Sequence, residues 1–290
     1  MIGRVSTFTQ SLYVLDQSLH TQAKLAGAQA QTASGLKSET FGGLGVSAGT
    51  LARRQGEADL ATAQSEAATG ALTVLQQSWS ALGSVSDLTD TILSTLSGAV
   101  SGTAASDLTS AAQGWLSDLE SILNGQFSGQ SMFAGTATDA QAVNLSDYAS
   151  GAAASYYGGS SDEQVFAGSD GQTIALSVKA DDPAIAELVD TLKGLINGTL
   201  DAATALDDVQ SAASGITDLR AGLSSGATRL QAIADRADTR AAALSDLVST
   251  LKDADLAEAS VLATQYETLL QTTYSTLNIL MSVKLSDYLR

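Results

Sequence analysis

Apolar residues recur every seven positions between Ile216 and Leu251, and this repeat constrains the fold more than any other feature of the sequence. A second apolar series runs alongside it, displaced by three residues. A spacing of 3.5 residues is typical of helices that pack along one seam. We therefore predict a coiled-coil-like helix over residues 201–252, roughly 78 Å long if unbroken, in an elongated molecule. The predicted seam consists of Ile216, Leu223, Leu230, Ile233, Leu244 and Leu251.

Both ends of the chain carry narrower apolar stripes with spacings of three and four residues. Such spacings predict helices, but the remaining positions are mostly Ala, Ser, Thr and Gln, so each helix needs a partner to bury its stripe. We expect the two terminal stripes to contact one another and to form an assembly interface. Its predicted residues are Val5, Phe8, Leu12, Leu15 and Leu19 at the N-terminus, and Leu262, Leu269, Leu277, Met281 and Leu285 at the C-terminus.

The same spacing predicts helices over about 46–96 and 107–123, and a helix that begins at Pro183 and ends before Asn197-Gly198. Glycines predict a loop over residues 34–45. Residues 125–183 differ, because short clusters of Gly, Ser and aromatic residues alternate there. Strands are predicted at 132–134, 165–166 and 173–178.

The predicted fold is mainly α. It is an elongated, antiparallel, coiled-coil-like helical bundle formed by the N- and C-terminal segments, with a small β-rich central insertion. Three domains are expected. Residues 1–40 with 255–290 form a terminal coiled-coil domain, residues 41–124 with 184–254 form a helical rod, and residues 125–183 form the β-rich insertion.

Composition excludes several classes of function. The chain has no cysteine and one histidine, His20, so disulfides, thiol nucleophiles and ordinary zinc sites are not expected. Its net charge of −17 argues against binding to nucleic acid, and predicts salt-dependent assembly if copies bring like charges together. We expect no cleavable signal peptide at the N-terminus. Residues 268–283 are too short and too polar for a membrane span.

Two short motifs resemble catalytic or cofactor sites. Residues 222–226 fit G-x-S-x-G, but that motif requires a preceding strand and a histidine base. Residues 43–48 fit the dinucleotide pattern G-x-G-x-x-A without a βαβ unit around it. Carboxylate pairs such as Asp181-Asp182 and Asp207-Asp208 are better explained by helix starts and solvated faces. We therefore expect no enzymatic activity and no cofactor.

The turn after the first predicted helix resembles that of the bacterial flagellin family. Residues 31–37 (Gln-Thr-Ala-Ser-Gly-Leu-Lys) are similar to the family's turn of Ser or Thr, Gly and a basic residue. The acidic Asp-Asp-Pro-Ala segment that usually follows is replaced here by residues 39–43. Together with the terminal stripes, the resemblance covers the chain except for much of residues 136–185.

Three further motifs are more similar to hook-associated members of this family than to filament flagellin. They are residues 129–135 (Gly-Gln-Ser-Met-Phe-Ala-Gly), 156–159 (Tyr-Tyr-Gly-Gly) and 285–289 (Leu-Ser-Asp-Tyr-Leu). The resemblance implies a junction protein between hook and filament, and the alternative is a filament subunit. It also implies type III export without a cleaved signal and an extracellular location. The implied partners are further copies of the chain, a neighbouring hook-associated protein, flagellin and an export chaperone.

Overall fold

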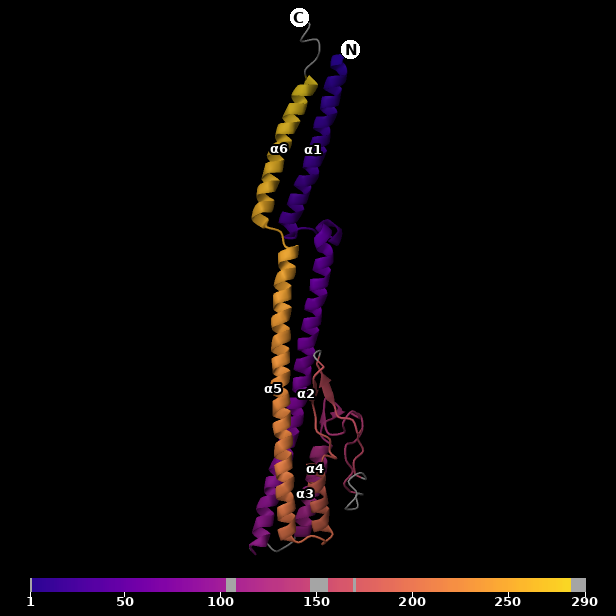
Figure 1. The fold of residues 1–290 in the computed structure, drawn as a ribbon, viewed down its shortest axis with the longest axis vertical. Helices are drawn as coiled ribbons and strands as arrows, with labels where there is room; N and C mark the ends of the chain where they lie inside the picture. The colour runs from indigo at the N-terminus through magenta and orange to yellow at the C-terminus, as the bar shows by residue number, and fades with distance from the viewer. Residues whose placement is uncertain (1, 103–107, 147–155, 169–170, 283–290) are drawn as a thin grey trace. The chain divides into compact units, whose positions relative to one another are not determined.

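The computed structural model describes residues 2–102, 108–146, 156–168 and 171–282, except for the side chains of residues 2–8, 10, 11 and 280–282. Within these ranges the chain is mainly α-helical, with two small antiparallel sheets (Figure 1). The helices are α1 (Ile2–Ser34), α2 (Ala48–Val100), α3 (Leu108–Leu123), α4 (Pro183–Ile196), α5 (Ala202–Lys252) and α6 (Leu256–Ser282), with a 3-10 segment at Phe41–Ser47. The predicted fold class is confirmed.

Local capping explains where several helices begin and end. Asp182 accepts a hydrogen bond from the backbone N–H of Ala184 at 3.0 Å, and Pro183 occupies the first turn of α4. The helix is followed by Gly198, whose φ of 67° suits glycine. At the start of α5, the N–H of Thr204 donates to Asp201 Oδ1 at 2.8 Å, and this bonding lowers the pKa of the Asp201 carboxyl. These ends agree with those predicted from sequence.

The chain forms two compact units. The terminal unit comprises residues 1–60 and 240–290, and the central unit comprises residues 61–239. The predicted division into three domains differs in its boundaries from these two units and stays a prediction.

The core of the central unit is formed by α2, α3, α4 and α5. Ile216, Leu223, Leu230 and Ile233 of the predicted seam are buried there. Gly226 lies on the same face, where a Cβ atom would be 3.1 Å from both Leu75 Cδ1 and Ile174 Cγ2. This close approach explains why a glycine interrupts the apolar series. Leu244 and Leu251 belong to the terminal unit and are half-buried.

Two short hairpins occupy part of the predicted β-rich region. Strands β1 (Gln126–Phe127) and β2 (Gln130–Ser131) are joined by Ser128 and Gly129, which both have positive φ. Strands β3 (Val165–Ala167) and β4 (Thr173–Ala175) pair with Phe166 opposite Ile174. The strands predicted at 165–166 and 173–175 are therefore confirmed.

The strand predicted at residues 132–134 is wrong, and β4 ends before residues 176–178. Phe133 and Ala134 are fully buried in irregular backbone. Their carbonyls accept hydrogen bonds from two separate segments, Phe133 from Ala180 and Ala134 from Ser160, rather than from one neighbouring strand. A half-buried strand would alternate buried and exposed side chains, but here the consecutive residues Phe133 and Ala134 are both buried in the core.

Candidate assembly surface

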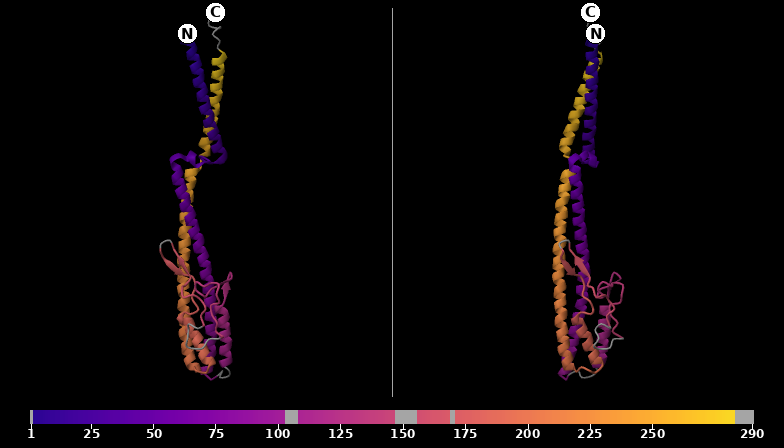
Figure 2. Two further views of the ribbon diagram at one scale, coloured as in Figure 1. Left: turned by 90° about the vertical axis from the view of Figure 1, so that its right-hand side faces the viewer. Right: turned by 45° about the vertical axis from the view of Figure 1, so that its right-hand side comes forward.

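Helices α1 and α6 pack side by side in the terminal unit, and their chain directions are opposite (Figures 1 and 2). The buried positions on these two helices are small or polar with one exception. They are Ser18, Thr21, Ala28, Ala259 and Leu270. The side-chain amide of Gln22 donates to the hydroxyl of Tyr274 and links the same two helices. A seam of small side chains allows close helix approach but buries little apolar area.

The leucines predicted for this seam lie elsewhere on the helices. Leu12, Leu15, Leu19 and Leu269 are each about half exposed, at 49%, 47%, 56% and 50%. Leu262 and Leu277 are half-buried. Leu12, Leu15, Leu19 and Leu269 therefore keep about half of their area exposed in the single chain, and their role in an assembly interface stays a prediction. Val5, Phe8 and Met281 have side chains outside the described set, and Leu285 lies outside the described residues.

An offset of one residue explains this difference. The buried and half-buried positions of α1 follow Val14, Ser18, Thr21, Leu25 and Ala28, a series with the same spacing as the leucine stripe. One residue corresponds to a rotation of about 100° around a helix. The two stripes therefore point in different directions. A search for large apolar residues finds the leucine stripe, whereas the close approach of α6 buries the stripe of smaller residues. The spacing of this second stripe can be seen in the sequence when small residues are included in the pattern.

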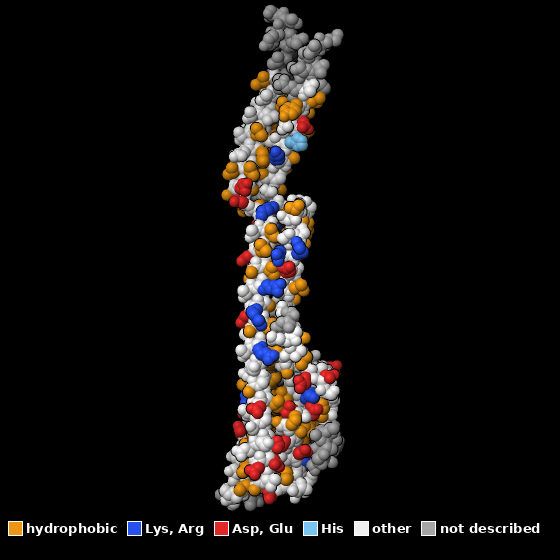
Figure 3. All heavy atoms as spheres, viewed as in Figure 1, with side chains coloured by type: hydrophobic (Ala, Val, Ile, Leu, Met, Phe, Trp, Pro, Cys, Tyr) orange, Lys and Arg blue, Asp and Glu red, His pale blue; other side chains and the backbone are white. Residues whose placement is uncertain are grey.

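Exposed apolar side chains are concentrated in the terminal unit. Sixteen large apolar side chains are exposed among the described residues, and thirteen of them belong to this unit. Figure 3 shows such side chains along the surface of α1 and α6. We call those on the two helices the terminal apolar surface. Its residues are Leu12, Tyr13, Leu15, Leu19, Leu256, Val261, Leu269, Tyr274 and Ile279.

The charge of the chain is distributed unequally between the units. The terminal unit contains nine Lys and Arg against ten Asp and Glu, whereas the central unit contains five against twenty-one. Their net charges are −1 and −16, which together give the −17 of the whole chain. The surface that exposes apolar side chains is therefore almost neutral, and it can approach a copy of itself with little repulsion.

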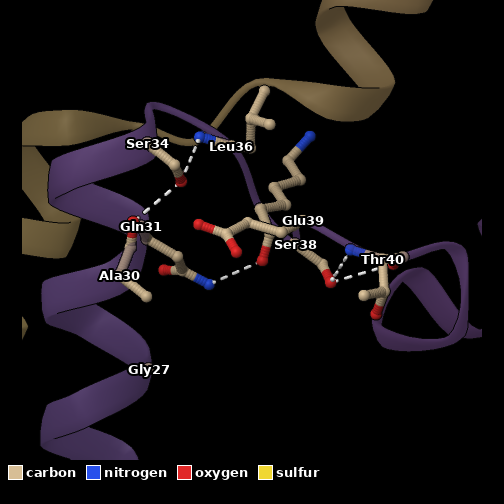
Figure 4. Close-up of a pocket in the computed structure, with 9 residues that line it drawn as sticks. Gly27, Ala30, Gln31, Ser34, Leu36, Ser38, Glu39 and Thr40 are labelled. Atoms are coloured by element: carbon tan, nitrogen blue, oxygen red, sulfur yellow. Dashed lines mark hydrogen bonds between the residues drawn. The ribbon is translucent and has the colours of Figure 1, made fainter.

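The turn after α1, which has the flagellin-like sequence, is held by local hydrogen bonds (Figure 4). Gly35 ends the helix with a φ of 72°, and its N–H donates to Gln31 O at 2.9 Å. The Gln31 amide then donates to Lys37 O at 3.0 Å, and the N–H of Leu36 donates to Ser34 Oγ at 3.3 Å. These bonds enclose an open hollow of about 230 Å³ beside Glu39 and Thr40.

The catalytic motifs are not supported where the structure describes them. Residues 222–226 lie within α5, so no strand precedes Ser224, and residues 43–48 form the 3-10 segment and the first residue of α2. His20 is exposed, with Nε2 3.7 Å from Asp16 Oδ2 on the same helix. Among the described residues, no cluster of three or more potential ligands is placed to hold a metal ion. No described helix is long and apolar enough to cross a membrane.

The helix α6, which contributes to the terminal apolar surface, lies in a part of the chain that matches a known protein family model. Residues 206–289 match the model of the bacterial flagellin C-terminal helical region. The match includes most of α5 and all of α6, so the resemblance to flagellins is confirmed over these residues. No curated protein sequence matches the chain.

Two solved structures are similar at low sequence identity. A protein from Vibrio parahaemolyticus, described as a flagellar hook-associated protein, is 18% identical, with a TM-score of 0.46, over 71% of this chain and 95% of that one. FlgL from Bacillus cereus is 15% identical, also with a TM-score of 0.46, over 65% of this chain and 98% of that one.

Proposed function

We propose that this protein is a structural component of the bacterial flagellum that assembles through its terminal unit. The observation that carries the proposal is the coincidence of two features on α6. This helix lies within the match to the flagellin C-terminal region, and it also contributes five residues to the terminal apolar surface. A structural role needs a surface that other copies cover, and this surface supplies one.

The physical driving force is burial of apolar area. At about 25 cal/mol per Å², burying several half-exposed leucines contributes on the order of 10 kcal/mol per subunit before the cost of ordering is subtracted. The terminal unit has a net charge of only −1, so repulsion between copies opposes this gain weakly. Val5, Phe8, Met281 and Leu285 are proposed as further members of the interface.

Within this function we propose the role of a junction protein of the FlgL type between hook and filament, with filament flagellin as the alternative. The motifs at 129–135 and 156–159 support the junction role, because they are similar to hook-associated members of the family. The two motifs lie close together: a Cβ added to Gly135 would lie 3.3 Å from the Tyr157 hydroxyl, and the N–H of Ser160, next to the second motif, donates to Ala134 O at 2.9 Å. The proposed partners are a neighbouring hook-associated protein, flagellin and an export chaperone, in an extracellular location.

Substitution on the terminal apolar surface tests the assembly mechanism. We expect Leu12→Ser, Leu15→Ser and Leu19→Ser together to abolish incorporation into flagella, because their apolar area faces solvent in the single chain. The helical content of the purified protein should change little. The matched control replaces exposed apolar residues of the central unit, Val100→Ser with Val165→Ser, and should incorporate normally. Normal incorporation of the triple variant would refute the mechanism.

Seeding distinguishes the junction protein from a filament subunit. Purified protein is added to the ends of sheared flagellin filaments and the products are observed by electron microscopy. The junction role predicts short caps of limited length. Long filaments made of this chain alone would favour the alternative role.

A further inference from the structure

Helix α5 ends without the residues that usually end a helix. The segment from Lys252 to Leu256 reads Lys-Asp-Ala-Asp-Leu and contains neither glycine nor proline. By contrast, α1 ends at Gly35 and α4 is followed by Gly198, both with positive φ. The stop after Lys252 therefore needs another cause, because nothing in these residues forbids a continuing helix.

Lys37, which is far away in the sequence, bonds to the last carbonyls of α5. Its ammonium donates to Thr250 O at 2.5 Å and lies 3.4 Å from Leu251 O, and its backbone N–H donates to Lys252 O at 2.8 Å. In a continuing α-helix, these three carbonyls would accept the N–H groups of residues 254, 255 and 256. Lys37 thus occupies the acceptors that the next turn would use.

The displaced donors also have new partners. The N–H of Ala254 donates to Gly35 O at 2.8 Å, and Leu36 forms an isolated antiparallel bridge with Asp253. Asp255 then begins α6, because its Oδ1 accepts the N–H groups of Ala257 at 2.9 Å and Glu258 at 3.1 Å. The bonds of one helical turn are therefore exchanged for bonds to the turn after α1.

This break changes which face of α6 is buried. Steps of seven from Leu244 through Leu251 would reach Glu258, which is exposed, whereas the buried series of α6 begins at Ala259. In an unbroken helix, a displacement of one residue would turn that series by about 100°. The interruption thus determines which side of α6 meets α1 and which side carries the terminal apolar surface.

We infer that Lys37 is a positioning residue that ends α5 and sets the orientation of α6, and that residues 253–255 become helical when its bonds are removed. This inference goes beyond the proposed function and does not depend on it. It concerns one residue, Lys37, whose side-chain donor and backbone donor can be removed separately.

Backbone chemical shifts of Asp253, Ala254 and Asp255, measured by NMR on the full-length chain, test the inference. In Lys37→Met, which removes the ammonium alone, we expect the Cα and Cβ shifts of these residues to move toward helical values. Lys37→Pro also removes the backbone donor and should move them further. Lys37→Arg keeps a cationic donor and should retain the original shifts, as should the control Lys24→Met on the exposed face of α1.

Two results would overturn the inference. Unchanged shifts in both Lys37→Met and Lys37→Pro would show that the local sequence ends α5 without Lys37. Movement toward random-coil values would show that Lys37 merely stabilises the last turn, because α5 would then fray instead of continuing.

Discussion

The guanidinium carbon of Arg220 lies 4.5 Å from the centre of the Trp79 ring, so a cation on α5 covers the face of an aromatic side chain on α2. Gly83, one turn further along α2, leaves space beside the guanidinium: a Cβ there would lie 3.6 Å from Nη2. Arg220 Nε is buried without a hydrogen-bond partner in the described structure, which offsets part of the attraction.

Removing this cation should destabilise the central unit slightly. We expect Arg220→Met to lower its free energy of unfolding by about 0.5 kcal/mol, because exposed cation–π pairs contribute about 0.5–1 kcal/mol and the buried Nε opposes that gain. Denaturant unfolding followed by tryptophan fluorescence measures the change. Arg236→Met is the control, since the Arg236 Nε donates to Ala232 O of its own helix at 3.0 Å. An equal effect in both variants would contradict the prediction.

Gly135 lies where residues 129–135 and residues 156–162 come close together. Its φ is 63°, and a Cβ there would lie 2.5 Å from Asp162 O and 2.8 Å from Ser160 O. We expect Gly135→Ala to destabilise the central unit by about 2–4 kcal/mol, from strained backbone and overpacking together. Gly171→Ala is a matched control with a φ of 78° and open space around the new methyl group. Gly171→Ala should lower the free energy of unfolding by only about 1 kcal/mol. Thermal unfolding of both variants measures the difference.

Tyr157 should ionise later than an ordinary tyrosine. Burial, with a smaller contribution from the charge of Asp181, raises the pKa of its phenol to about 12 from 10.0. The neutral phenol is favoured in the folded chain, so its contribution to stability is complete below pH 10.0 and is lost as the pH rises through about 12. Ultraviolet titration should show a late tyrosine transition whose amplitude is smaller in Tyr157→Phe. Tyr13→Phe, at an exposed position, should leave that transition in place.

Assembly should depend on salt less than the net charge of −17 predicts. If copies meet through the terminal unit, whose charge is −1, then raising the salt from about 0.1 to about 1 M should change the critical concentration by less than about threefold. Light scattering measures that concentration. Adding two charges to exposed positions of this unit, Gln265→Glu with Gln271→Glu, should create a clear salt dependence.

The matched variant adds the same two charges to the central unit, as Gln77→Glu with Gln113→Glu. It should assemble like the original chain. An equal response of both variants would show that the central unit also forms the contact between copies.

Much of the secondary structure could be predicted because helix signals are local. The seven-residue series from Ile216, the acidic start at Asp182-Pro183 and the stop at Gly198 each depend on neighbours within one or two turns. The prediction of a strand at residues 132–134 is wrong because two separate segments enclose these residues, and neither segment is close to them in sequence. The resemblance of residues 31–37 to a family turn was visible, but the bonds from Lys37 to α5 were not.

Two features could be read from the sequence alone, namely the long helices and the apolar stripes at both ends of the chain. The tertiary structure decided which stripe is buried, because close packing of α1 on α6 selects Ser18 and Thr21 over the larger Leu15 and Leu19. It also decided where α5 ends, because the carbonyls of its last turn are bonded by a lysine 213 positions before Thr250. Periodicity is a property of neighbours along the chain, whereas the choice between two equally periodic faces depends on what packs against them.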